Sequence, residues 1–140
     1  MHPPMNIRPA SPYMLIFRES SPDAYGALSA EERQKLLEQW NAWYDGLAAA
    51  GKVQHGQPLE PGGRVVRERR VTDGPFAESN EAVGGYFLLT VSDLEEATAI
   101  AQQCPSLSLG MSVEVRPVAG ACPGLGVQGR PLAAAELSRA

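Results

Sequence analysis

The stretch TDGPF, from Thr72 to Phe76, places an acid, a glycine and a proline between two apolar segments. An aspartate at a turn accepts hydrogen bonds from the backbone amides after it, and a residue before proline favours extended dihedral angles. The pattern predicts a rigid corner that fixes the Asp73 carboxylate, with Phe76 anchored against the core. Proton transfer needs a fixed carboxylate beside a cleft, and a plain turn uses the same residues. Asp73 is therefore the first catalytic candidate, and a purely architectural corner is the alternative.

Two further side chains could act with this carboxylate. His55 lies inside the predicted domain and can titrate near neutral pH, which makes it a candidate base. A histidine beside a glycine in a connecting segment is otherwise simply solvated. Arg116 should share one strand face with Glu114, and it is a candidate partner for an anion. That face is expected to be the interior of a dimer or the wall of a pocket.

Aromatic side chains could supply the apolar walls of a ligand site. Trp40, Trp43 and Tyr44 recur at helical spacing, and Phe76 follows the corner. We assign Trp40 and Phe76 as ligand-binding candidates, and burial in the core is the alternative for such aromatic residues. The expected ligand is a small, partly apolar organic acid.

The composition limits the classes of function. The chain has 140 residues with 44% hydrophobic content, enough for one compact domain. Its net charge of -4 argues against a general nucleic-acid or anionic-membrane binder. No apolar run has the length of a transmembrane helix, so the protein is expected to be soluble and cytoplasmic. Cys104 and Cys122 lack the spacing of a zinc site, and neither a metal nor an organic cofactor is expected.

The elements that must position these residues can be read from the apolar pattern. Residues 13–18 and 86–91 are expected to be buried strands, and residues 112–118 a half-covered strand. Capping boxes begin two helices, one with Ser29 and Glu32 and one with Ser92 and Glu95. The first helix is expected to run from residue 30 to residue 50, with a terminating glycine after it. The second is expected to end before a proline, with one apolar face that contains Leu94, Ala97, Ile100, Ala101 and Cys104.

Between these elements the pattern is more ambiguous. KVQHG is expected to be extended, and RVVRERRV is either one exposed strand or a very tight hairpin. Gly84 and Gly85 precede a strand and lack the lysine and serine of a phosphate loop, which favours a bulge or a close backbone approach. The order strand, helix, two strands, helix, strand predicts an α+β fold of the ferredoxin-like βαββαβ type with a four-stranded antiparallel sheet.

Two helices can cover only one face of such a sheet. Strands as apolar as YMLIF and YFLLTV would leave a large exposed patch on the other face, so a homodimer is expected. The proline-rich residues 1–12 are expected to form a flexible arm, residues 13–118 the domain, and residues 119–140 an extension.

The stretch from Val71 to Tyr86 and the segment SVEVRPV resemble the YCII-related domain family, in its branch with the DGPF signature. The resemblance runs from about Tyr13 to Val118. It implies a ferredoxin-like α+β fold that assembles as a dimeric α/β barrel. It leaves the activity nearly open, because most members have no assigned activity.

The resemblance also implies a site that this chain does not fully carry. In the wider superfamily, a histidine on the first helix and a nearby aspartate are proposed as a proton-transfer pair, and one similar enzyme removes chloride from a product of aromatic ring degradation. The corresponding position here is Trp40. An indole cannot exchange protons near neutral pH, so the pair is not carried over.

Two hypotheses of function follow. The first is a small-molecule-binding homodimer with lyase-like or isomerase-like activity on a small organic acid. The second is a non-catalytic regulatory or protein-partner-binding module, because genes of the DGPF branch often neighbour those of extracytoplasmic-type sigma factors. The extension from Ala119 would then be the docking segment.

Overall fold

The computed structural model describes residues 10–19, 24–74, 82–120 and 124. The strands are β1 (Ser11–Glu19), β2 (Val53–Pro58), β3 (Gly63–Arg67), β4 (Arg70–Gly74), β5 (Ala82–Val91) and β6 (Ser112–Pro117). The helices are α1 (Ala30–Ala49), α2 (Leu94–Ala101) and the short 3-10 helix η1 (Leu107–Leu109). Most of the predicted arm and of the predicted extension lies outside the described residues.

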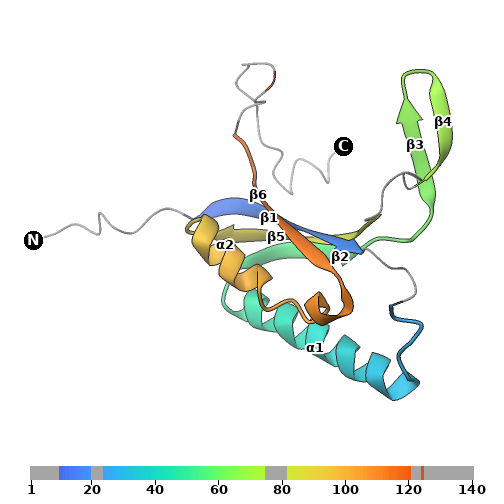
Figure 1. Cartoon of the computed structure of the whole chain (residues 1–140). Coiled ribbons are helices and arrows are strands. Elements are labelled where there is room, and N and C mark those ends of the chain that lie inside the picture. Colours follow the sequence, from blue (N-terminus) through green and yellow to red (C-terminus); the bar gives the residue numbers. More distant parts are fainter. Residues whose placement is uncertain (1–9, 20–23, 75–81, 121–123, 125–140) are drawn as a thin grey trace, which may run out of the picture.

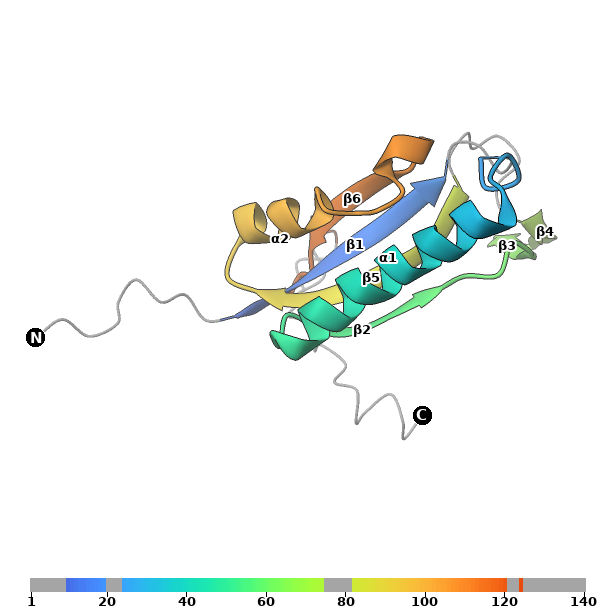
Figure 2. The same cartoon turned by 90° about the horizontal axis from the view of Figure 1, so that it is seen from below.

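The main sheet has four strands in the order β2-β5-β1-β6, and all neighbouring strands are antiparallel. Helix α1 connects β1 to β2, and α2 connects β5 to β6. Both helices lie against the same face of the sheet (Figures 1 and 2). The α+β class, the four-stranded antiparallel sheet and the two helices are confirmed, and the arrangement is consistent with the ferredoxin-like fold.

The segment RVVRERRV forms the tight hairpin rather than a single strand. Arg67 pairs with Arg70, and the turn places Glu68 at a positive φ of 47°. Strands β3 and β4 make a separate two-stranded sheet that stands away from the main sheet (Figure 1). The hairpin is therefore an insertion between the second and third strands of the ferredoxin-like unit.

Local signals explain both ends of α1. The side chain of Ser29 accepts a hydrogen bond from the backbone N–H of Glu32, and the Glu32 carboxylate accepts one from the backbone N–H of Ser29. This is the predicted capping box. Gly51 follows the helix with a φ of 72°, a left-handed conformation that glycine adopts without a steric penalty.

The start of α2 differs from the expectation by one residue. The N-cap is Asp93 rather than Ser92, and its carboxylate accepts a hydrogen bond from the backbone N–H of Glu96. Leu94, the first helical residue, is 45% exposed instead of buried. Within the described residues, neither long helix combines the length and the apolar character that are needed to span a bilayer.

The core lies between the sheet and the helices. Alternate residues of the two central strands point into it, as a period of two requires. The buried apolar residues are Leu15, Phe17, Leu47, Phe87, Leu89, Val91, Ala97, Ile100, Ala101, Cys104 and Met111. Of the residues in α1, only Leu47 is buried, while Trp40, Trp43 and Tyr44 of the preceding turns pack against the core and stay partly exposed.

Candidate functional site

A cleft of about 500 Å³ lies between α1 and the sheet. Its aromatic walls come from α1, which carries Trp40 and Tyr44, and from the central strands, which carry Phe17 and Phe87. Leu37 also lines the cleft and is 52% exposed. This side of α1 therefore faces partly into an open space.

The aromatic walls form a continuous cluster of edge-to-face contacts. The ring centroids of Phe17 and Trp40 are 5.0 Å apart, and those of Tyr44 and Phe87 are 5.2 Å apart. Such aromatic pairs contribute more stabilisation than the burial of their apolar area alone, and they restrict the rotation of each ring. The walls are thus held in place by neighbouring rings.

A buried serine fixes the wall residue Trp40. Ser106 is fully buried, and its hydroxyl accepts hydrogen bonds from Trp40 Nε1 at 2.9 Å and from the Tyr25 hydroxyl at 3.0 Å. Burial raises the pKa of Tyr25, and the hydrogen bond to Ser106 partly opposes that effect. The indole donor of Trp40 and the phenol donor of Tyr25 are therefore already satisfied by the protein.

A carboxylate reaches the cleft next to a bulge in β5. Phe17 pairs with Gly85 and Arg18 pairs with Val83, so Gly84 is the extra residue of β5. The Glu19 carboxyl group lies directly on Gly84, where an added Cβ would be 2.9 Å from its carbon atom. The close approach and the bulge expected for the glycine pair are both present.

The polar groups of the cleft are few. Among the described lining residues, Glu19 is the charged one, and Asn41 adds a side-chain amide. Gln57 pairs with Tyr86, which puts its side chain on the sheet face away from the helices, together with His55. No group of three or more His, Cys, Asp or Glu side chains within the described part of the chain could hold a metal ion. The cleft can therefore offer an aromatic enclosure, one carboxylate and uncharged hydrogen-bonding groups.

The candidates from the sequence lie in three different places. Trp40 lines the cleft, while Asp73 is exposed on β4 of the projecting hairpin and does not line it. His55 and Arg116 lie on the sheet face away from the helices. Phe76 lies outside the described residues. The structure does not bring Asp73, His55 and Arg116 together with Trp40.

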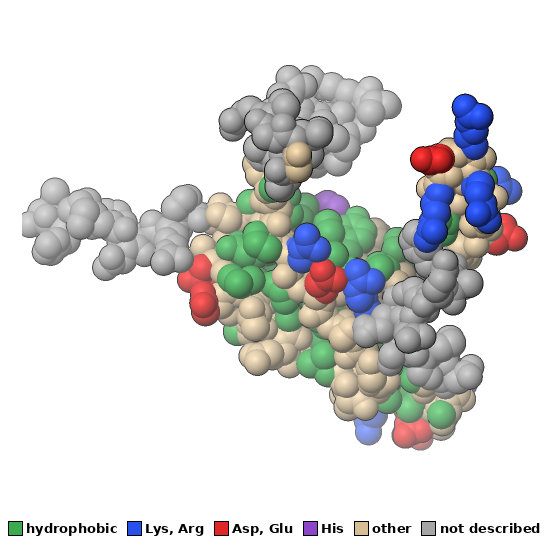
Figure 3. All heavy atoms as spheres, turned by 45° about the horizontal axis from the view of Figure 1, so that its top comes forward, with side chains coloured by type: hydrophobic (Ala, Val, Ile, Leu, Met, Phe, Trp, Pro, Cys, Tyr) green, Lys and Arg blue, Asp and Glu red, His purple; other side chains and the backbone are tan. Residues whose placement is uncertain are grey.

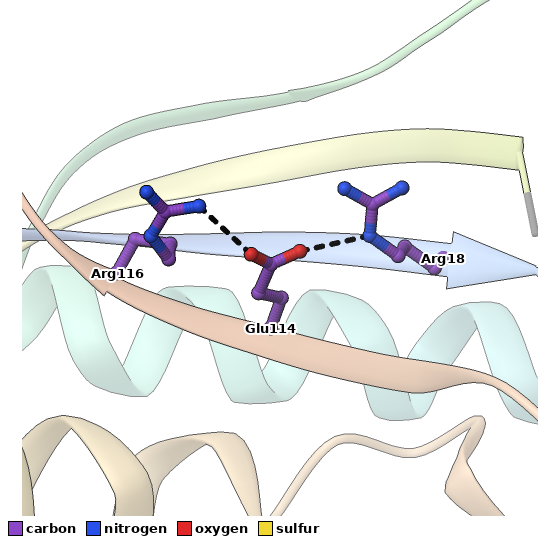
Figure 4. Close-up of polar contacts among 3 residues, drawn as sticks. All are labelled: Arg18, Glu114 and Arg116. Carbon is purple, nitrogen blue, oxygen red and sulfur yellow. Dashed lines mark hydrogen bonds and ion pairs between the residues drawn. The ribbon is translucent and has the colours of Figure 1, made fainter.

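On the open face of the sheet, Glu114 lies between two arginines (Figure 4). It accepts a hydrogen bond from Arg18 Nε at 2.9 Å and one from Arg116 at 3.0 Å. Arg116 and, secondly, Arg18 lower the pKa of Glu114. The predicted shared face of Glu114 and Arg116 is confirmed, and Arg116 is engaged with this carboxylate.

The rest of the open face is largely apolar. Met14, Ile16 and Leu88 are half-buried there, and Figure 3 shows hydrophobic side chains on this face around the arginine and glutamate group. At its edge, His55 Nδ1 lies 3.1 Å from the Tyr86 hydroxyl. This pair belongs to the open face and not to the cleft.

Sequence reasoning missed Glu19, Tyr25 and Ser106. Glu19 had one usable signal, because the glycine pair at 84–85 indicated that something approaches the backbone there. Ser106 is bonded to Trp40 and Tyr25, which lie 66 and 81 residues away in the sequence, and no local sequence pattern predicts contacts over such separations.

Two comparisons with known proteins give matches. A family model described as the YCII-related domain matches residues 13–119. A protein of Rhizobium meliloti (strain 1021), named "Uncharacterized protein R00369", is 31% identical over 105 residues, which cover 70% of this chain and 85% of that protein.

Proposed function

The chain belongs to the YCII-related domain family, and we propose that it is a homodimer that binds a small molecule in the cleft beneath α1. The cleft carries the proposal. A volume of about 500 Å³ with mostly aromatic and aliphatic walls and a few polar groups is typical of small-molecule sites. The hydrogen bonds of Trp40 and Tyr25 to Ser106 support a site whose walls are formed before the ligand arrives.

Lyase or isomerase chemistry would need a proton acceptor in contact with the ligand. Glu19 is the carboxylate that lines the cleft, so we assign it this role in any proton transfer on a bound ligand. Asp73 stays a prediction as the proton acceptor, and it would have to act from the exposed hairpin.

The homodimer is supported by the open face of the sheet. Met14 pairs with Leu88 across β1 and β5, Ile16 lies two residues further along β1 on the same face, and all three are only half-buried. A second copy that packs on the same face would remove this apolar surface from water. Such face-to-face packing is the dimeric α/β barrel expected from the sequence.

Ligand binding can be tested by tryptophan fluorescence, because the chain has two tryptophans and only Trp40 lines the cleft. Trp43→Phe leaves Trp40 as the reporter, and Trp40→Phe leaves Trp43. The buried Nε1 of Trp43 has no hydrogen-bond partner among the described residues, so its replacement removes no hydrogen bond there. A fragment screen should quench or shift the emission of Trp43→Phe and have much less effect on Trp40→Phe. Equal responses, or none, would contradict the cleft as the binding site.

The dimer can be tested by sedimentation equilibrium over a range of protein concentrations. Ile16→Lys places a charge at the centre of the open face, and it should convert the dimer to a monomer. Val66→Lys is the matched control, because Val66 is 68% exposed on the separate hairpin. A wild-type chain that stays monomeric at tens of micromolar would reject the dimer, as would dissociation by both variants alike.

A further inference from the structure

We infer that the ligand of the cleft carries a cationic group, such as a primary ammonium, next to an aromatic or aliphatic body. The inference rests on the proposed ligand-binding function and specifies its substrate class. It depends on three features of the cleft: the charge of Glu19, the way Gly84 places that charge, and the aromatic rings beside it.

The charge at the cleft is negative. Glu19 is the charged side chain among the described lining residues, and it has no ion-pair partner in the described part of the chain. The adjacent Arg18 cannot neutralise it, because Arg18 points to the opposite face of the sheet and binds Glu114 there. A ligand cation would therefore meet an uncompensated carboxylate, while a ligand anion would be repelled.

The bulge keeps this carboxylate at the cleft. Both Glu19 carboxylate oxygens would lie 3.1 Å from a Cβ added at Gly84, so the group lies flat on the backbone of β5. Any side chain at this position would displace it. The glycine thus fixes the position of the charge, whereas the carboxylate of a freely rotating side chain would have no fixed position.

The aromatic walls favour the same kind of ligand. Trp40 and Tyr44 present rings to the cleft, and an ammonium group close to a ring face is attracted by the ring quadrupole. The indole donor of Trp40 is used by Ser106, so it is not available for a hydrogen bond to an anion. An aromatic enclosure with one carboxylate is the arrangement expected for an organic amine.

An organic acid would require a different place. The arginines that could bind it, Arg18 and Arg116, lie on the open face and already share Glu114 (Figure 4). No lysine or arginine is found among the described residues of the cleft. The charge of the site therefore selects against the organic acid that the sequence suggested.

Three probes with the same ring test the inference: 2-phenylethylamine, 2-phenylethanol and phenylacetate. Their binding to the full chain is measured by the emission of Trp40 in the Trp43→Phe variant. At neutral pH the amine should bind about tenfold more tightly than the alcohol, since a charge-assisted hydrogen bond contributes more than a neutral one. Phenylacetate should bind most weakly.

Glu19→Gln keeps the shape of the side chain and removes its charge, so the preference for the amine over the alcohol should disappear. Gly84→Ala should reduce the preference, because the added Cβ moves the carboxylate. Asp73→Asn and Glu60→Gln are matched controls on exposed carboxylates, and they should keep it. Thermal melting of each variant checks that it is folded.

The outcomes separate the two proposals. If phenylacetate binds as tightly as the amine, or if Glu19→Gln keeps the preference, the cationic ligand is rejected while the binding cleft stands. If Asp73→Asn is the variant that loses the preference, the charge that selects the ligand is on the hairpin and the inference is wrong. If no probe changes the emission of Trp40, the cationic ligand is rejected. Failure of the fragment screen as well would reject the binding cleft.

Discussion

Ser106 is the residue on which the geometry of the cleft depends most directly. It is fully buried, and one hydroxyl oxygen accepts from an indole on α1 and from a phenol in the turn before α1. A buried polar group is stabilising only when its hydrogen bonds are made, so this serine links three segments through two bonds. The same bonds determine which donors remain for a ligand.

Replacing Ser106 by alanine should therefore destabilise the fold and loosen the wall. The donors of Trp40 and Tyr25 would both lose their acceptor, and we expect the free energy of unfolding to fall by about 1–3 kcal/mol. Chemical denaturation measures this loss. Ser108→Ala, at an exposed position two residues away, should change it by less than about 0.5 kcal/mol. Equal effects would show that the hydrogen bonds to Ser106 contribute little.

Glu114 gives a pH-dependent prediction. Its folded pKa is lowered by Arg116 and Arg18, from an ordinary value of 4.5. A carboxyl group with a lowered folded pKa stabilises the protein above its unfolded pKa, and this contribution is lost as the pH falls through the folded pKa. Glu114→Gln should therefore lower the melting temperature at neutral pH, and the difference from wild type should shrink below pH 4.5. A difference that stays constant down to strongly acidic pH would contradict the role of the arginines.

At the residue scale, the sequence predicted the face of an element on which a residue lies better than its contacts with residues of other elements. Helical spacing placed Trp40 on the inner side of α1, and strand alternation placed Glu114 and Arg116 on one face, because both inferences use only local periodicity. The meeting of Glu19 with Gly84 depends on the register of β1 against β5. That register is set by the packing of the whole sheet, and no short stretch of sequence contains it.

At the scale of elements, the ends of α1 carry the clearest local information. The capping box and Gly51 were predicted and are present, since both depend on a few neighbouring residues. The predicted start of α2 was wrong by one residue, because Ser92 and Asp93 are adjacent residues of equal capping ability and each is followed three positions later by a glutamate. The hairpin of β3 and β4 could not be distinguished from one strand, because its turn has no glycine or asparagine.

Two glycines of this region should respond in opposite directions to the same substitution. Gly46 lies inside α1 and Gly51 has a φ of 72°, and an added Cβ would meet no atom within 4 Å at either position. Gly46→Ala should stabilise the protein by about 1 kcal/mol through helix propensity. Gly51→Ala should destabilise it by about 1 kcal/mol, because alanine is strained in the left-handed region. Thermal and chemical unfolding measure both, and changes of the same sign would contradict the assigned backbone conformation.

At the scale of the whole molecule, the described residues form a two-layer structure, with both long helices on one face of the sheet and no described helix on the other (Figures 1 and 2). The fold class could be predicted because local patterns of apolar residues indicate the order of the elements and the period of each strand. The cleft could not be predicted, because it lies between the middle turns of α1 and the sheet, and its volume depends on how closely these two layers approach. An apolar stripe gives the direction of a helix face but not its distance from the neighbouring layer.

Substitutions of two neighbouring leucines in β5 should affect the stability of the fold and the proposed association separately. Leu89 is completely buried in the core, and Leu89→Ala should lower the free energy of unfolding by about 2–5 kcal/mol. Leu88 lies half-buried on the open face, so Leu88→Ala should mainly weaken the proposed dimer. Denaturation at low protein concentration and sedimentation equilibrium measure the two effects. Equal destabilisation by both variants, with unchanged association, would contradict an interface on this face.

The pairing of β1 with β6 also determines where the polypeptide enters and leaves the sheet. The backbone N–H of Val118 donates to the carbonyl of Pro12, so the first and last strands run side by side and their outer ends are adjacent. A short linker could therefore join these two ends, and new termini could be opened between Glu68 and Arg69 at the tip of the hairpin. Such a circular permutation would keep every strand pair of the main sheet.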